Sequence, residues 1–240
     1  MKVSIIIPLY NEANNIAEII KRVESTRVKK EIIIIDDGSI DGSRDILKAL
    51  QGKNPGLILI FHDKNQGKGA AIHTGLSHAT GDLVLIQDAD LEYDPNDYGY
   101  LLAPFQNSNT NVVYGSRNLR DNPRVSLAFY WGGVLLSLYT NLLYGSNLTD
   151  ITTGYKVFRA DLIRDIDLQG NGFEFCAEVT AKILRCHVPI IEVPISYVPR
   201  SWDEGKKINW LDGLIALWYL TKLRFRREKQ VHIMHEEEHL

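Results

Sequence analysis

The sequence has few cysteines, which are abundant in small extracellular proteins held together by disulfide bonds. Only two of its 240 residues are cysteines, Cys176 and Cys186, and it has no CxxC motif and no Cys/His pair at metal-ligand spacing. The two thiols could pair, but such sparse cysteines favour two packed, reduced thiols. After Met1 and Lys2 comes VSIIIPLY, which is too short for a signal-peptide core and cleavage site. These absences predict a cytoplasmic protein.

A strong charge of either sign is also missing. The formal net charge is −3, so there is no general attraction to nucleic acid, and nucleic acid is not an expected partner. We find no internal repeat and no low-complexity linker. With 45% hydrophobic residues, the chain can bury one sizeable core. We therefore expect a single domain over residues 1–228 and a polar tail at 229–240.

The first half alternates between β-rich and helical patterns. Short, continuous apolar runs predict strands covered on both faces, and they occupy residues 3–10, 31–37, 56–63, 82–90 and 111–117. Apolar residues at helical spacing lie between them, at Ile16, Ile19, Ile20 and Val23 and again at Ile46, Leu47 and Leu50. A weaker helix is predicted at 69–79, because Gly75 interrupts it. This order predicts an α/β fold with a Rossmann-like, doubly wound, mostly parallel sheet.

A polar loop follows each predicted strand. The loops are YNE (10–12), DDGS (36–39), HDKNQGKG (62–69), DAD (88–90) and GSR (115–117). The carboxyl ends of strands in a doubly wound sheet share one edge, where ligands bind. One loop rich in acids, glycine and asparagine is ordinary turn chemistry. Five such loops at one edge predict a binding site.

The most informative loop lies in LVLIQDADLEYDP, residues 83–95, where an apolar run leads into Asp88, Asp90 and Glu92. In an extended segment alternate side chains point the same way, so these acids would face one spot. Clustered like charges are unfavourable unless they are neutralised, and hard oxygen ligands suit Mg²⁺ or Mn²⁺. The pattern predicts a divalent cation that holds a diphosphate. The alternative is a surface loop whose acids point to water.

Two neighbouring motifs are less specific. Gly67-Lys68-Gly69 has neither the full dinucleotide fingerprint nor the GK[ST] of a P-loop, and alone it indicates a loop and a helix start. Lys68 at a helix N-terminus would nevertheless be placed to assist a phosphate. Asp37 in DDGS could equally be a turn or cap residue.

In their order and spacing, IIPLYNEANNI, IIDDGSIDGS, NQGKGAA, GDLVLIQDADLEYDP and VVYGSR resemble the family-two glycosyltransferases of GT-A fold. Within that family the chain most resembles the dolichol-phosphate mannosyltransferase-like, polyprenyl-phosphate hexosyltransferase branch. The likeness continues through DITTGYKVFR, GFEFCAEV and EVPISYVPRSWDEGKKI, to about residue 225. It implies one catalytic domain, with a nucleotide-sugar-binding half at 1–118 and an acceptor half at 119–228.

The resemblance implies an activity. It is the inverting, metal-dependent transfer of a hexose from a nucleotide diphosphate-sugar, of the GDP-mannose or UDP-glucose type, to a polyprenyl or dolichyl phosphate.

The resemblance also implies roles for individual residues. Asp88 would lie near the donor ribose or sugar, and Asp90 would ligate the metal. Glu92 stands where many relatives carry Gln and would be a second metal ligand. Arg117 would reach a phosphate, so Asp88, Asp90 and Arg117 are the predicted catalytic residues. The rest of the donor site would comprise Pro8, Tyr10, Asn11, Glu12, Asp37, Lys68, Arg200 and Lys206 or Lys207.

The acceptor decides which further residues are needed. A phosphate monoester has a second pKa around 6, so it is already anionic at neutral pH and needs only cations to position it. Arg117 and Arg124 are the candidates, because guanidinium matches phosphate geometry. A sugar hydroxyl would instead need a carboxylate base, for which Asp150, Glu174 and Glu178 are available. From the sequence both acceptors remain open.

Two segments of the second half raise the question of a membrane. Residues 125–149 carry no charge and are long enough to span a bilayer, yet small or polar side chains recur along one side at Gly132, Gly133, Ser137, Thr140, Asn141 and Tyr144. Residues 208–225 are rich in Trp and Leu and lead into a basic run. Such helices suit an anionic membrane surface, so we expect peripheral association with its cytoplasmic face. Plain core packing is the alternative.

Two other functional classes would also use metal-binding acids or an apolar helix. A nucleotidyltransferase would release pyrophosphate from a triphosphate instead of a nucleoside diphosphate. A non-catalytic, membrane-associated binding module would not need Asp90.

Overall fold

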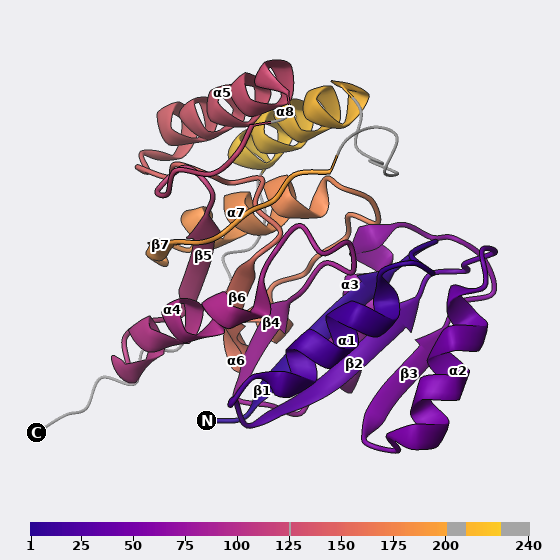
Figure 1. The fold of residues 1–240 in the computed structure, drawn as a ribbon. Helices are drawn as coiled ribbons and strands as arrows, with labels where there is room; N and C mark the ends of the chain where they lie inside the picture. Colours follow the sequence, from indigo (N-terminus) through magenta and orange to yellow (C-terminus); the bar gives the residue numbers. More distant parts are fainter. Residues whose placement is uncertain (125, 201–209, 227–240) are drawn as a thin grey trace, which may run out of the picture.

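The computed structural model describes residues 1–124, 126–200 and 210–226. Within them, a seven-stranded sheet has the order β3-β2-β1-β4-β6-β5-β7 (Figure 1). Its strands are β1 (Val3–Leu9), β2 (Lys30–Asp36), β3 (Leu57–Phe61), β4 (Leu83–Ile86), β5 (Val112–Ser116), β6 (Lys156–Arg159) and β7 (Ile190–Pro194). β6 is antiparallel to both neighbours and the other pairs are parallel. The predicted mostly parallel α/β sheet is confirmed.

The five predicted strands are all present, but one of them ends early. β4 stops at Ile86, whereas the apolar run predicts a strand up to residue 90. β6 and β7 were not predicted from the sequence. β6 has only four residues and begins with a lysine, and β7 ends in a proline, so neither shows the long apolar run that identifies the first five.

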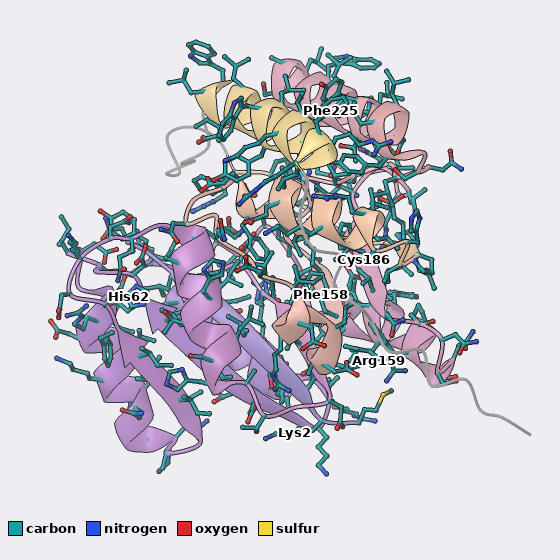
Figure 2. All side chains as sticks on the ribbon, turned by 180° about the vertical axis from the view of Figure 1, so that it is seen from behind. Lys2, His62, Phe158, Arg159, Cys186 and Phe225 are labelled. Carbon is teal, nitrogen blue, oxygen red and sulfur yellow. The ribbon has the colours of Figure 1, made fainter. Side chains whose placement is uncertain are left out.

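Both faces of the sheet are covered, which explains the continuous apolar runs. Along β1, Ile5 and Ile7 pack with one core cluster and Ile6 packs with the other. The first cluster lies under α1 (Ile16–Ser25), α2 (Ser43–Lys53) and α4 (Tyr98–Leu102). The second lies under α3 (Lys68–His78), α6 (Ala160–Asp165) and α7 (Phe175–Arg185), and it includes Phe158, labelled in Figure 2.

Gly75, which weakens the helix prediction, allows α3 to lie close against the sheet. A Cβ at this position would come within 2.5 Å of Cγ2 of Ile6 and 2.9 Å of Cδ1 of Ile35. The close contact brings the start of α3 to the carboxyl edge of β1 and β2.

Cys176 and Cys186 are free thiols that pack against the second core cluster, the one under α3, α6 and α7.

A third layer lies over α7 on the side away from the sheet. It consists of α5 (Leu127–Tyr144) and α8 (Trp210–Phe225), which lie side by side at the top of Figure 1. Tyr139 of α5 forms a hydroxyl hydrogen bond with Thr221 of α8, and Tyr144 donates to the Leu220 carbonyl. These two helices cover one end of the carboxyl edge of the sheet.

α5 exposes its apolar side and buries its polar side. Ser137 and Thr140 are buried, whereas Trp131 is 57% exposed and Leu142 is 83% exposed. The buried side chains hold the next loop, since Ser137 accepts from the Ile151 amide and Asn141 accepts from the Leu148 amide. The small and polar stripe of the sequence is therefore the face turned to the protein, and core packing does not account for the exposed residues. No helix in the described part of the chain has the length and apolarity to cross a bilayer.

Candidate active site

A cavity of about 930 Å³ opens at the carboxyl edge of the sheet and extends to the α5–α8 layer. Its polar end is lined by loops that follow β1, β2, β3, β4 and β5, and its other end by mostly apolar and glycine residues of the two helices, with Asp212 of α8 among them. The lining residues that matter below are Pro8, Tyr10, Glu12, Asp37, Lys68, Asp88, Asp90, Glu92, Arg117, Arg124, Gly133, Leu136, Asp150, Gly154, Arg200, Gly213 and Leu217. The five predicted loops therefore converge, as the strand order requires.

The three acids after β4 line one cavity but have different partners. The chain leaves the strand at Ile86, and Leu91 has a φ of 62°, so the alternation of an extended strand does not apply. Asp88 instead forms an ion pair with Lys68, which is the first residue of α3. Oδ1 of Asp88 lies 2.5 Å from Nζ of Lys68. Burial disfavours the ammonium form of Lys68, but Asp88 raises its pKa. The expected strand alternation is wrong, because the chain turns at residues 89–90 and again at Leu91, but all three acids line the same cavity.

Asp90 and Glu92 face Arg200. Nη2 of Arg200 lies 3.1 Å from Oδ2 of Asp90, and its Nε lies 3.8 Å from Oε1 of Glu92. Nη1 donates to both carboxylate oxygens of Glu12, each at 3.1 Å. Glu92 also accepts hydrogen bonds from the Tyr197 hydroxyl and from the Arg200 amide. Residues predicted for metal and phosphate binding thus come together around a guanidinium.

The surroundings of Asp90 suit a divalent cation. Burial and the negative charges of Asp88 and Glu92 raise its pKa to about 7, although Arg200 opposes the shift. The available donors are carboxylate oxygens, the type that Mg²⁺ and Mn²⁺ prefer. Among the described residues, no three Asp, Glu, His or Cys side chains already form a closed metal-binding group. The residues therefore fit a cation whose remaining ligands come from water and substrate.

The loops after β1 and β2 are tied to each other. Asn11, at a φ of 51°, accepts from the Ile40 amide, and its own amide donates to Ser39. Asp37 is 2% exposed, and its carboxylate accepts from the amides of Gln66 and Gly67 and lies 2.7 Å from Nδ1 of His62. Asp37 therefore fixes the turn before α3 in addition to lining the cavity.

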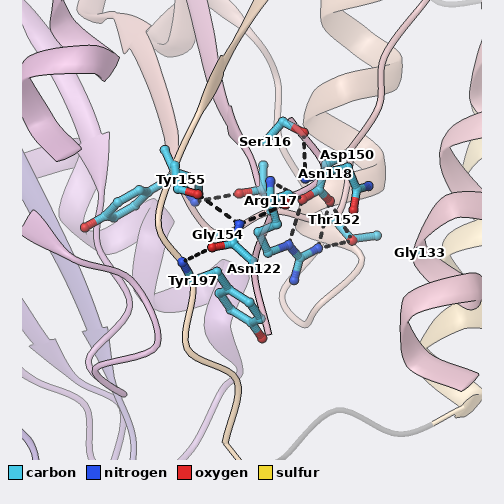
Figure 3. Close-up of polar contacts among 12 residues, drawn as sticks. Ser116, Arg117, Asn118, Asn122, Gly133, Asp150, Thr152, Gly154, Tyr155 and Tyr197 are labelled. Atoms are coloured by element: carbon cyan, nitrogen blue, oxygen red, sulfur yellow. Dashed lines mark hydrogen bonds and ion pairs between the residues drawn. The ribbon is translucent and has the colours of Figure 1, made fainter. Parts of the chain in front are cut away.

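Arg117, which is partly exposed, and the buried Asp150 form a two-pronged ion pair (Figure 3). Nε and Nη2 of Arg117 each lie 2.7 Å from a carboxylate oxygen of Asp150, and Nη2 also donates to Thr152. The guanidinium lies over the Tyr197 ring, 5.1 Å from its centroid. Burial opposes ionisation of Asp150, but Arg117 lowers its pKa. Among the described residues none forms a hydrogen bond with Nη1 of Arg117, which also lines the cavity.

Only some of the other predicted acceptor residues line the cavity. Arg124 lines the cavity and lies over the Tyr130 ring of α5, 4.0 Å from its centroid. Glu174 does not line the cavity, and its carboxylate accepts from the Gly172 amide. Glu178 also turns away, toward the amides of Gln169 and Gly170. Lys206, with Lys207, lies outside the described residues.

A further set of residues, which no sequence pattern predicts, supports this site. Lys156 is fully buried, donates to the carbonyls of Ile151 and Thr153 and lies 4.3 Å from the Tyr114 ring centroid. The Tyr93 hydroxyl accepts from the Gly154 amide. These contacts shape the loop 150–154, and only the likeness carried by DITTGYKVFR had pointed to it.

Gly154→Ala is expected to lower kcat by roughly tenfold or more while the protein stays folded. A Cβ at residue 154 would overlap Oδ2 of Asp88 and come within 2.9 Å of Tyr93. The Asp88 carboxylate would then have to move away from Lys68. Steady-state kinetics and a melting curve measure the two effects. Gly99→Ala on α4 is the control, because nothing lies within 4 Å of its Cβ position, and equal kcat in both variants would contradict the prediction.

Comparison with known proteins agrees with this geometry. The profile described as Glycosyl transferase family 2 matches residues 4–167. An undecaprenyl-phosphate mannosyltransferase of Micrococcus luteus is 30% identical over 224 residues, which are 89% of this chain and 90% of that protein. A dolichol-phosphate mannosyltransferase of Pyrococcus furiosus is 27% identical over 93% of this chain, which spans 63% of that longer protein.

A solved structure has the same fold. It is glucosyl-3-phosphoglycerate synthase from Mycobacterium tuberculosis in complex with Mn²⁺, UDP and phosphoglyceric acid. The TM-score is 0.73 at 16% identity, over 95% of this chain and 80% of that one. The likeness confirms the predicted GT-A fold. The alternatives of a nucleotidyltransferase and a non-catalytic module find no support. By the match over most of its length and the geometry of its loops, this chain belongs to glycosyl transferase family 2.

Proposed function

We propose that this glycosyltransferase moves a hexose from a nucleotide diphosphate-sugar to a polyprenyl phosphate, with inversion at C1. The observation that carries the proposal is the cavity, which is acidic and polar at the sheet edge and apolar between α5 and α8. One end suits a nucleotide with its diphosphate and the other suits an isoprenoid chain. The two mannosyltransferase relatives make GDP-mannose the first donor to test, with UDP-glucose next.

At the donor end, the chain's own residues bind and orient the nucleotide-sugar. Pro8, Tyr10, Asn11, Glu12 and Asp37 border the nucleotide. Lys68 and Arg200, with Lys206 beyond the described residues, supply positive charge for the diphosphate. Asp88, held by Lys68, faces the sugar.

Asp90, with Glu92, is the proposed ligand of Mg²⁺ or Mn²⁺. When bound, the cation offsets charge on the departing diphosphate.

At the acceptor end, the proposed role of Arg117 is to position the lipid phosphate. An oxygen of the phosphate attacks C1 as the bond from C1 to the diphosphate breaks, and a nucleoside diphosphate leaves. The acceptor needs no base, since it is already anionic at neutral pH. A hydroxyl acceptor would need one, yet Asp150 is held by Arg117 and Glu174 faces its own loop. The remaining Nη1 of Arg117, with Arg124 near the cavity mouth, favours phosphate.

The reaction is tested with purified protein, candidate donors, Mg²⁺ or Mn²⁺, and vesicles containing polyprenyl phosphate. We expect a lipid-linked hexose of inverted configuration and one equivalent of nucleoside diphosphate. Sugar transfer to a glycan hydroxyl, with none to the lipid phosphate, would overturn the acceptor assignment. Release of pyrophosphate from a nucleoside triphosphate would overturn the reaction.

The outer face of α5 and α8 is the proposed contact with the cytoplasmic face of a membrane. Its exposed large side chains that do not line the cavity are Leu127, Trp131, Leu138 and Leu142 on α5, and Leu211, Ile215, Trp218 and Phe225 on α8. Nζ of Lys222 lies 4.4 Å from the Trp218 ring centroid, and Nε of Arg224 donates a hydrogen bond to the Leu143 carbonyl. Apolar and aromatic side chains flanked by cations suit the interface of an anionic bilayer.

The double change Trp131→Ser and Trp218→Ser is expected to weaken binding to anionic vesicles by roughly tenfold or more, because two indoles leave the interface. Vesicle sedimentation measures the partition. Tyr100→Ser is the control, since Tyr100 is 59% exposed on α4, away from this face. Equal losses in both proteins would mean that α5 and α8 do not form the membrane contact.

A further inference from the structure

Arg200 occupies the centre of the acids proposed to hold a cation. Its guanidinium bonds Glu12 from the loop after β1 and Asp90 from the loop after β4. Its own amide donates to Glu92 at 2.8 Å. The Arg200 side chain is 15% exposed and the Glu12 side chain 6%. The guanidinium is thus built into the site and joins segments that are far apart in the sequence.

Three carboxylates among the described residues converge on Arg200. Oxygens of Glu12 and Asp90 lie 3.1 Å from its guanidinium, and an oxygen of Glu92 lies 3.8 Å from it. Asp88 pairs with Lys68 instead. Carboxylate oxygens grouped in this way are the donors that a divalent cation takes.

The guanidinium and a divalent cation would share the Asp90 carboxylate. Oδ1 of Asp90 already accepts from the Glu92 amide, and Oδ2 accepts from Nη2 of Arg200. Two positive groups within bonding distance of one carboxylate repel each other strongly. A cation on Asp90 therefore favours release of Nη2 of Arg200 from that carboxylate, while Nη1 keeps its bonds to Glu12, and the released Nη2 can bond a second anion. The diphosphate of the donor is the anion that enters this part of the cavity.

We propose that Arg200 is an internal counter-ion that a divalent cation displaces from Asp90, so that cation and nucleoside diphosphate bind as a pair and not independently. The inference rests on the proposed function, because it takes the nucleotide-sugar site as given. It assigns Nη2 of Arg200 two successive partners, the Asp90 carboxylate before binding and the diphosphate afterwards. The coupling is reciprocal: the nucleotide tightens cation binding by the factor by which the cation tightens nucleotide binding.

The test is Mn²⁺ binding to the nucleotide-free protein, measured from the electron paramagnetic resonance signal of free Mn²⁺. Arg200→Met is expected to bind Mn²⁺ roughly tenfold more tightly than wild type, because the competing cation is gone. Adding UDP or GDP should tighten Mn²⁺ binding in the wild type much more than in Arg200→Met. Arg22→Met is the matched control, since it removes the same charge from the exposed Glu18–Arg22 pair on α1, and its Mn²⁺ affinity should not change.

The outcomes separate this inference from the proposed function. If Arg200→Met binds Mn²⁺ no more tightly than wild type, while Asp90→Asn loses binding, the counter-ion role is overturned and the metal ligand stands. If Asp90→Asn binds Mn²⁺ like wild type, the proposed metal site itself is wrong. Arg200→Lys keeps the charge but loses the planar fork, so intermediate affinity is expected. Should Arg200→Met fail to fold, an Arg200→Lys affinity no higher than wild type would equally overturn the proposal.

Discussion

Asp90→Asn is expected to lower kcat/KM for sugar transfer by about a thousandfold, the scale on which loss of one charge-stabilising group affects catalysis. The substitution keeps the size of the side chain and its contact with the Glu92 amide, but it removes the charge that a cation needs. Arg200 still has Glu12 as a partner, so the fold should persist. The metal-dependent thermal shift given by a nucleoside diphosphate should disappear together with the activity.

Asp63→Asn is the matched control for this experiment. Asp63 is an exposed acid in the loop after β3, at the same edge of the sheet, and it does not line the cavity. Its substitution removes the same charge and should leave kcat/KM unchanged. An Asp90→Asn enzyme with more than a tenth of wild-type activity would remove Asp90 from the mechanism.

Asp150→Asn is expected to be the most destabilising single change, with a loss of about 3 kcal/mol in the free energy of unfolding. It leaves the partly buried Arg117 beside a neutral group, and the lipid phosphate loses an oriented guanidinium. The pH dependence should also change. The pKa of Asp150 is lowered from its ordinary value of 3.8, so its contribution to stability is present above that pH and is lost below it. Asp150→Asn should therefore lose less stability in acid than wild type does.

The double variant Arg117→Met with Asp150→Leu separates stability from catalysis. Replacing both partners of a buried pair with apolar groups is often close to neutral, so most of the free energy of unfolding should return. Activity should not return, because no guanidinium is left for the acceptor. Denaturant unfolding and the transfer assay give the two readouts. If activity returned with stability, Arg117 would have only a structural role.

The part of the fold that the sequence predicts well is the part with local signals. The first five strands are visible in the sequence as continuous apolar runs, and α1 has its apolar residues at helical spacing. β6 could not be found in this way, because it is four residues long and begins with Lys156. That lysine is buried only because the loop 151–153 provides carbonyls for it. Such a strand depends on contacts made far along the chain.

The site shows the same division. The sequence predicted which loops line the site, because parallel strands bring their carboxyl ends to one edge. The partners within the site could not. Asp150 meets Arg117 across 33 positions, and Arg200 meets Asp90 across 110. The strand alternation rule failed for Asp88, Asp90 and Glu92, because the positive φ of Leu91 turns the chain just where the rule assumes extended backbone.

The place of β6 has a consequence for how the chain is synthesised. β4 is flanked by β1 on one side and by β6 on the other, and β6 is made about seventy residues after β4. Until residues 156–159 leave the ribosome, β4 is an open edge that can pair with another nascent chain. The first four strands can assemble early, but their free edge stays vulnerable through the synthesis of α5, whose leucines also face outward. A chaperone or a nearby bilayer would protect the chain most during that interval.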